Sequence, residues 1–207
     1  SAFDEAWSLI KMPIVPDSLK YLGRDDLKEG RYDDHWEGEF EDPITNVIRP
    51  LKIRYKYKNL PLLDNYGEKD MDAPYHTYAG HIGNLDRGKQ DLPTRLQDLD
   101  WRGIETPRTN IDAENIDSMA YVNWVDVPGG PTDHHFPKSS WSETKVDLRK
   151  RGYMKALYDA IAFLMSKQGH ALKPSDIQSS LAEQMWDDKK EWPVRDDLWV
   201  HLRRLGK

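Results

Sequence analysis

Alternating apolar and polar residues predict two β-strands that pair with each other. In 36–41, apolar residues and glycine alternate with three glutamates, and in 51–58, Leu, Ile and Tyr alternate with Lys and Arg. A period of two places the apolar side chains on one face of a strand. The pair Asp42-Pro43 between the two segments is typical of a turn. We expect an antiparallel pair with its apolar face on the core and with acids opposite bases on the solvent face.

Further elements are predicted in the C-terminal half. Residues 118–127 form an apolar run of strand length, and 141–147 predicts another strand that leads into the basic residues 149–151. From 153 to Gly169, apolar residues recur every three to four positions, which predicts an amphipathic helix that ends at this glycine.

Shorter signals complete the expected order of elements. Residues 170–174 are expected to be extended, and Ser175 with Gln178 fits a capping box at the start of the next helix. Apolar spacing also predicts a helix at 3–11 and a last helix from Val194 to Leu205.

Residues 59–117 show no sustained period and contain 12 acidic and 6 basic residues. A structureless loop of this length is uncommon in a compact domain. We therefore expect a long irregular insertion, which covers a site or contacts protein partners. The whole chain, 1–207, is expected to be a single α/β domain with a mixed, mostly antiparallel sheet flanked by helices, and 191–207 to contain the C-terminal helix.

Composition limits the classes of function. The chain has 207 residues, no cysteine and a formal net charge of −6, which is spread as −10 over 1–144 and +4 over 145–207. Thiolate metal sites and cysteine nucleophiles are excluded, and the acidic majority argues against general binding of nucleic acid. No apolar run approaches 18 residues, so we expect no membrane span and a cytoplasmic location.

The basic residues between the last strand and the long helix form a candidate anion site. Arg149, Lys150 and Arg151 precede Gly152, which lets the backbone come close to a ligand. The start of a helix presents unpaired N–H groups and a partial positive charge, which phosphates favour. A solvated helix start is the alternative explanation.

The segment 149–157, RKRGYMKAL, resembles the pyrophosphate loop of the GCN5-related N-acetyltransferases, in which an Arg or Gln stands three residues before a Gly. Arg149, Gly152, Ala156 and Leu157 match that pattern, and the ordered resemblance covers about 118–190, which would form the cofactor-binding core. It implies acetyl-CoA as co-substrate. The implied contacts are Thr144, Lys145 and Val146 for the pantetheine arm, and Arg149, Lys150, Arg151, Gly152, Tyr153, Met154 and Lys155 for the pyrophosphate.

The resemblance also implies the chemistry, which is transfer of an acetyl group to the amine of a small molecule or peptide. Glu143 or Asp126 would accept the proton of the amine, although each also fits as an ordinary strand carboxylate. In the family a tyrosine often protonates the leaving thiolate, but Trp186 stands at that place and an indole cannot do so. Tyr158 or Tyr121 could replace it, although both also fit a core. Met154 adds bulk where Gly or Ala is usual.

Three alternatives remain open from the sequence. The same scaffold could be a non-catalytic structural or interaction protein, for example a phage virion or accessory component, which would place it in a virion. The segment 158–207 resembles a winged-helix DNA-binding core, although four aspartates crowd it. Asp133, His134 and His135 could contribute to a metal site together with His76, His81 and nearby acids, but adjacent histidines of a strand point to opposite sides. We therefore predict no metal.

Overall fold

The fold is taken from a computed structural model of the chain, which describes a defined subset of its residues. The described residues are 14–15, 18–27, 30–63, 69–83, 116–125, 138–175, 178–195 and 198.

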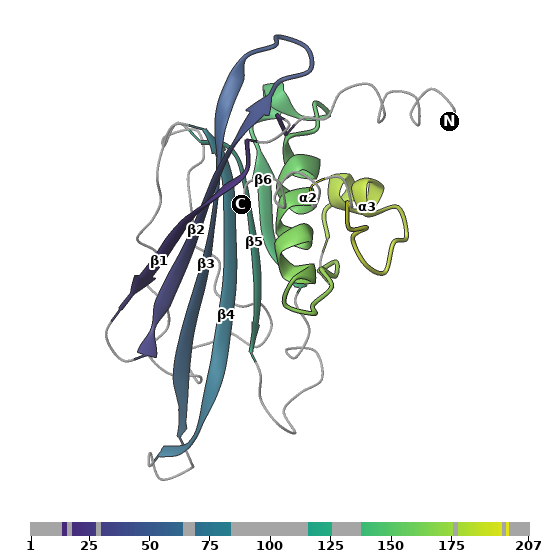
Figure 1. Cartoon of the computed structure of the whole chain (residues 1–207). Helices are drawn as coiled ribbons and strands as arrows, with labels where there is room; N and C mark the ends of the chain where they lie inside the picture. The colour runs from purple at the N-terminus through teal and green to yellow at the C-terminus, as the bar shows by residue number, and fades with distance from the viewer. Residues whose placement is uncertain are drawn as a thin grey trace.

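Among the described residues, six strands form one sheet, and each strand pairs antiparallel with the next along the chain (Figure 1). Helix α2 covers one face of the sheet at the β4–β6 side, and helix α3 lies beyond it (Figure 1). The α/β class is thereby confirmed, with an antiparallel sheet where a mixed one was expected. The elements are β1 (Lys20–Asp26), β2 (Tyr32–Glu41), β3 (Ile48–Leu63), β4 (Lys69–Gly83), β5 (Ile116–Val125), β6 (Lys138–Thr144), the 3-10 turn η5 (Val146–Leu148), α2 (Tyr153–Ser166) and α3 (Ser180–Trp186).

The predicted pair of alternating strands is confirmed as β2 and β3. Trp36 lies opposite Ile53 and Gly38 opposite Leu51, so the apolar sets share one face. The other face differs from the expectation. Lys56 and Lys58 were expected in solvent, but they are 3% and 8% exposed, so over 51–58 both faces of β3 are largely buried.

The expected irregular insertion at 59–117 is wrong in its first part. Strand β3 continues to Leu63, and β4 occupies Lys69–Gly83 between β3 and β5. Sequence alternation is weak in β4 because buried apolar residues lie on both of its faces, Tyr75 on one and Tyr78 and Ile82 on the other. Residues 84–115 lie outside the described part of the chain.

Several predicted boundaries shift by a few residues. Strand β6 ends at Thr144 rather than 147, because η5 turns the chain before the basic residues. Helix α3 begins at Ser180 rather than just after Ser175, and its N-cap is Ser179. The helix expected at 3–11 lies outside the described residues. So does most of the last one, whose first residues, Val194 and Arg195, are not helical.

The core lies between α2 and the sheet. Eleven of the fourteen residues of α2 are buried, because its far side is also covered. There Tyr158 packs against Trp186 and Trp192, with ring centroids 5.6 and 5.1 Å away. The buried carboxylate of Asp159 accepts hydrogen bonds from Trp192 Nε1 at 2.9 Å and from Lys155 Nζ at 2.7 Å. These contacts attach the chain after α3 to the long helix.

Gly80 lets α2 approach the sheet closely. A Cβ added there would lie 3.1 Å from Ile161 Cδ1 and 3.2 Å from Leu157 Cδ2. We expect Gly80→Val to lower the free energy of unfolding by about 2 kcal/mol through overpacking, measured by urea denaturation. Ala79→Val, whose side chain points to the other face, is the matched control. Equal losses in both variants would show that α2 does not depend on Gly80.

No helix among the described residues has both the length and the apolar character needed to cross a membrane.

Candidate functional site

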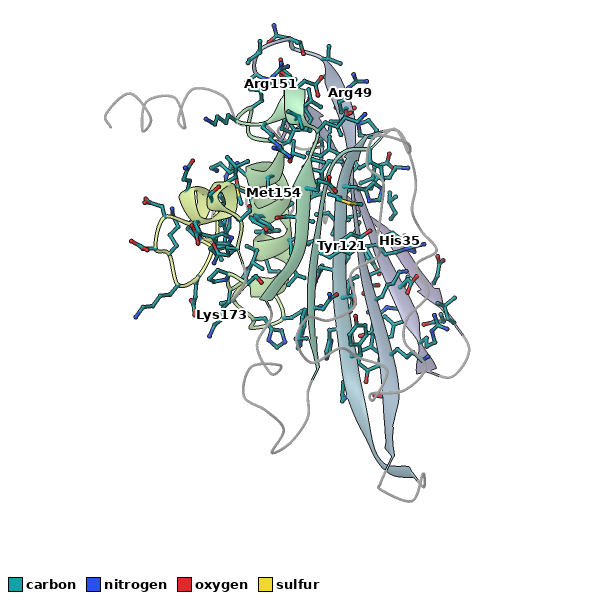
Figure 2. The ribbon with its side chains drawn as sticks, turned by 180° about the vertical axis from the view of Figure 1, so that it is seen from behind. His35, Arg49, Tyr121, Arg151, Met154 and Lys173 are labelled. Carbon is teal, nitrogen blue, oxygen red and sulfur yellow. The ribbon has the colours of Figure 1, made fainter. Side chains whose placement is uncertain are left out.

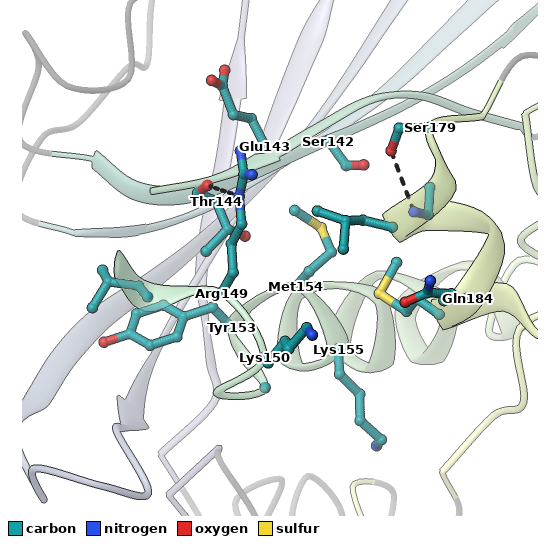
Figure 3. A pocket seen from close by; sticks show the side chains of 15 residues that line it. Ser142, Glu143, Thr144, Arg149, Lys150, Tyr153, Met154, Lys155, Ser179 and Gln184 are labelled. Carbon is teal, nitrogen blue, oxygen red and sulfur yellow. Dashed lines mark hydrogen bonds between the residues drawn. The ribbon is translucent and has the colours of Figure 1, made fainter. Parts of the chain in front are cut away.

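A pocket of about 480 Å³ lies where β6, the basic turn 149–152, the start of α2 and α3 meet (Figure 3). Its volume is in the range of small-molecule sites. The lining residues are Ser142, Glu143, Thr144, Leu148, Arg149, Lys150, Gly152, Tyr153, Met154, Lys155, Ser179, Leu181, Ala182, Gln184 and Met185.

One end of the pocket is cationic. Arg149 and Lys150 are exposed and line it, and Arg149 Nε donates to the Thr144 carbonyl oxygen at 3.2 Å. The intrahelical bonding of α2 starts with Ala156 N–H to Gly152 O at 2.9 Å, so the amides just before it have no acceptor within the helix. Anions are favoured at such a start.

The backbone of the turn adopts an uncommon shape. Lys150 has φ +61° and Gly152 has φ +84°, both in the left-handed region. Glycine adopts this conformation without steric cost, whereas a lysine there is uncommon. Glycine is thus favoured at the N-cap of α2, whereas the conformation of Lys150 requires support from the residues around it.

A second wall of the pocket is the outer edge of β6. No described strand pairs with this edge. Lys145 N–H donates inward to Asp117 O at 3.0 Å, and in an antiparallel pair the bonding direction alternates along the strand. The backbone groups of Ser142 and Thr144 therefore point outward to the open edge. A bulge at Ser140 follows from the pairing of Trp141 with Tyr121 and of Ser139 with Val122.

The remaining wall is apolar and comes largely from two helices. Met154 of α2 lies inside the pocket (Figure 3), and Leu181, Ala182 and Met185 of α3 line the side near it. The start of α3 is fixed by Ser179 Oγ, which accepts from Ala182 N–H at 3.3 Å. The pocket therefore combines a cationic end with an apolar wall and a polar strand edge.

Two cations of the basic segment are paired with carboxylates. Lys155 Nζ contacts Asp159 Oδ2 at 2.7 Å one turn along α2. Arg151 Nη1 lies 3.4 Å from Asp42 Oδ2, and Figure 2 shows Arg151 at the end of the molecule that carries the β2–β3 turn. Arg149 and Lys150 therefore supply most of the pocket's positive charge.

The carboxylate of Asp42 is buried at the junction of two turns. Burial raises its pKa, but the amides of Ile44 and Thr45, the hydroxyl of Tyr153 and the Arg151 guanidinium together outweigh this effect and hold the pKa below the usual range. Burial and the bond to Asp42 raise the pKa of Tyr153. Asp42 is therefore an anion that accepts from both turns near neutral pH.

The structure brings most of the expected cofactor residues together, but not all of them. Three lie outside the lining: Lys145 pairs with Asp117 at 3.4 Å, Val146 is 75% exposed, and Arg151 faces Asp42. Those that line the pocket are Thr144, Arg149, Lys150, Gly152, Tyr153, Met154 and Lys155.

The two expected catalytic residues, Glu143 and Tyr158, differ in their position relative to the pocket. Glu143 lines the pocket, but its carboxylate points away from α2, to the opposite face of the sheet (Figure 3). Tyr158 is 1% exposed in the aromatic cluster on α2 and does not line the pocket. Trp186, at the place of the family's tyrosine, is buried in the same cluster. Tyr121 is 4% exposed, and Asp126 lies outside the described residues.

The α3 side of the pocket and Ser142 were not predicted as parts of the site from the sequence. Leu181 and Met185 read as one apolar face of a helix, and nothing in the sequence states what that face covers. Ser142 could have been predicted, because in β6 it alternates with Glu143 and therefore shares a face with the expected contact Thr144.

The candidate metal residues do not form a site in the described part of the chain, where no group of three His, Asp or Glu side chains could hold an ion. His76 and His81 lie five residues apart on β4 and so point to opposite faces. Asp133, His134 and His135 lie outside the described residues.

The chain matches no protein-family model, and comparisons with curated proteins and with solved structures found no significant match.

Proposed function

We propose that the pocket binds acetyl-CoA and that the chain transfers the acetyl group to an amine. The observation that carries the proposal is the pocket itself, in which the basic turn, the start of α2 and an open strand edge meet. The resemblance of RKRGYMKAL to a pyrophosphate loop supports the same ligand. In the proposed complex, the ligand's phosphates lie at the turn and its pantetheine arm follows β6.

The charge of the pocket supports a diphosphate. Arg149 and Lys150 contribute two positive charges, because Lys155 and Arg151 are paired with Asp159 and Asp42. A diphosphate diester carries two negative charges and can also accept from the amides at the start of α2.

The open edge of β6 supports an extended ligand with amide groups. Ser142 and Thr144 offer outward backbone groups of the type that pair with a neighbouring strand. Pantetheine contains two amides, and its methylene groups would lie against Met154 and the apolar side of α3. The thioester would then reach the part of β6 next to the Ser140 bulge.

The reaction would use groups from both faces of the sheet at β6. The amine nitrogen attacks the thioester carbon, an N–H of β6 stabilises the oxyanion, and the C–S bond breaks to release the thiolate. Because Glu143 faces away from α2, it could accept the amine proton if the acceptor approaches around the edge of β6 from the opposite face. Tyr158 and Trp186 are buried apart from the pocket, so neither would protonate the thiolate.

Calorimetry with acetyl-CoA and a thiol-release assay over a panel of amines test this function. We expect a Kd in the micromolar to millimolar range, about 1 μM to 1 mM, and amine-dependent release of CoA thiol. Glu143→Gln is expected to lower the rate of release at least about 100-fold while leaving the Kd unchanged, because its carboxylate does not face the pocket. Absence of acetyl-CoA binding to the unaltered chain would exclude the proposal.

A second candidate is a scaffold that binds CoA without catalysis. The observation that favours it is that the described lining contains a single carboxylate, Glu143, which points away, and that Tyr158 is inaccessible. In that case acetyl-CoA and CoA would bind with measurable Kd, and no amine would release thiol.

A further inference from the structure

The β2–β3 turn is joined to the basic turn by one buried carboxylate, that of Asp42. Its side chain is 2% exposed. Oδ1 accepts from the amides of Ile44 at 2.8 Å and Thr45 at 3.1 Å, which belong to its own turn. Oδ2 accepts from the hydroxyl of Tyr153 at 2.8 Å and faces Arg151 Nη1 at 3.4 Å. Oδ1 thus accepts from the β2–β3 turn, and Oδ2 accepts from residues of the basic turn and the start of α2.

Tyr153 and Arg151 flank Gly152, the N-cap of α2. The ring of Tyr153 also packs on Phe40, with centroids 4.2 Å apart, and Phe40 lies two residues before Asp42. The chain around Gly152 is therefore held by an ion pair, a hydrogen bond and a ring contact.

The basic turn needs such support. Lys150 and Gly152 have positive φ, and a lysine in this region persists where its surroundings fix it. The same contacts turn Arg151 away from the pocket, which leaves Arg149 and Lys150 beside it. They also fix the first residue of α2 and hence the direction of the amides that follow.

We propose that Asp42 is a positioning residue of the pocket, acting through Tyr153 and Arg151. It touches no ligand. It fixes the turn 149–152, so that the amides at the start of α2 and the side chains of Arg149 and Lys150 converge on the same anion. The effect on the ligand rests on the proposed function, whereas the effect on the turn does not.

Two variants separate this role from that of the β2–β3 turn. Asp42→Asn keeps an oxygen for the Ile44 and Thr45 amides, but places an NH2 group where Oδ2 faces Arg151. Tyr153→Phe removes the hydrogen bond that the Tyr153 hydroxyl donates to Asp42 and keeps the ring contact with Phe40. Asp147→Asn is the matched control, because it removes an exposed carboxylate close to the same turn.

Two readouts are needed, namely hydrogen exchange of the amides 150–155 without ligand and the Kd for acetyl-CoA by calorimetry. In both variants we expect exchange at 150–155 to speed up at least several-fold and the Kd to rise about tenfold, the effect of about 1.4 kcal/mol. Amides of the α2 interior should be unchanged. In Asp147→Asn both readouts should match the unaltered chain.

The outcomes are distinct. Unchanged exchange at 150–155 in Asp42→Asn and Tyr153→Phe would overturn the inference, whatever the ligand does. Faster exchange with an unchanged Kd would also overturn it, because the turn would then not matter for the ligand. If the unaltered chain binds no acetyl-CoA but exchange speeds up in both variants, the proposed function fails while the positioning of the turn by Asp42 is supported.

Discussion

Replacing Asp159 by alanine is expected to lower the free energy of unfolding by about 3 kcal/mol, which lies between the cost of an unsatisfied buried group and that of a broken buried ion pair. Its carboxylate is 2% exposed and accepts from Lys155, Trp192 and Arg195, the last at 3.4 Å. Alanine would leave the buried indole N–H of Trp192 without its acceptor. Lys155, 47% exposed, can turn to water and contributes less to the loss.

Thermal and urea unfolding measure this loss. A change of about 3 kcal/mol corresponds to a Tm lower by about 6–12 °C for a chain of this size. Asp159→Asn keeps an oxygen for Trp192, so its free energy of unfolding should lie between those of Asp159→Ala and the unaltered chain. Asp147→Ala removes an exposed acid and should change the free energy of unfolding little. A loss in Asp159→Ala no larger than that in Asp147→Ala would show that Asp159 does not hold the chain after α3.

Replacing Arg149 and Lys150 together by glutamine is expected to weaken acetyl-CoA binding about 30-fold, or about 2 kcal/mol. Each cation faces the pocket from an exposed position, so each contributes less than a buried charge pair would. Glutamine is shorter than either side chain but stays polar, and it removes the charge. Stability should change by less than about 0.5 kcal/mol, because neither side chain packs in the core.

Calorimetry at two salt concentrations checks this expectation. Binding by the unaltered chain should weaken as salt is added, and the double variant should show a smaller dependence. The matched control is Lys189→Gln with Lys190→Gln, an exposed basic pair after α3 that does not line the pocket. If both double variants bind alike, net charge rather than the pocket attracts the ligand, and the anion site is excluded.

Periodicity was sufficient to predict the elements whose faces differ in polarity. The β2–β3 pair and α2 were found because each has one strongly apolar face. Strand β4 was missed because both of its faces are covered, so buried apolar residues lie on both of them, Tyr75 on one face and Tyr78 on the other. The place of β4 in the core follows from its packing against α2. This contact joins segments far apart in the chain, so the local sequence pattern does not indicate it.

The candidate site was predictable as far as it is local in sequence. The strand, basic turn and helix are consecutive, so their junction at Gly152 could be placed. The direction of Arg151 could not, because it is set by Asp42, 109 residues away. Tyr158 fitted both a catalytic acid and a core residue from the sequence. The choice between them could not be predicted, because Trp186 and Trp192 cover it through contacts across about 30 residues.

The two outer strands of the sheet differ in how well they resist joining another molecule. Strand β1 has a bulge at Leu22 and carries Arg24, Asp25 and Asp26, features that discourage pairing with a neighbour. Strand β6 has the bulge at Ser140 and the charge of Glu143, but no described strand pairs with its outer edge along Ser142–Thr144, which forms a wall of the pocket. An extended ligand bound along Ser142–Thr144 would occupy these outward backbone groups and so leave them unavailable for pairing with another chain.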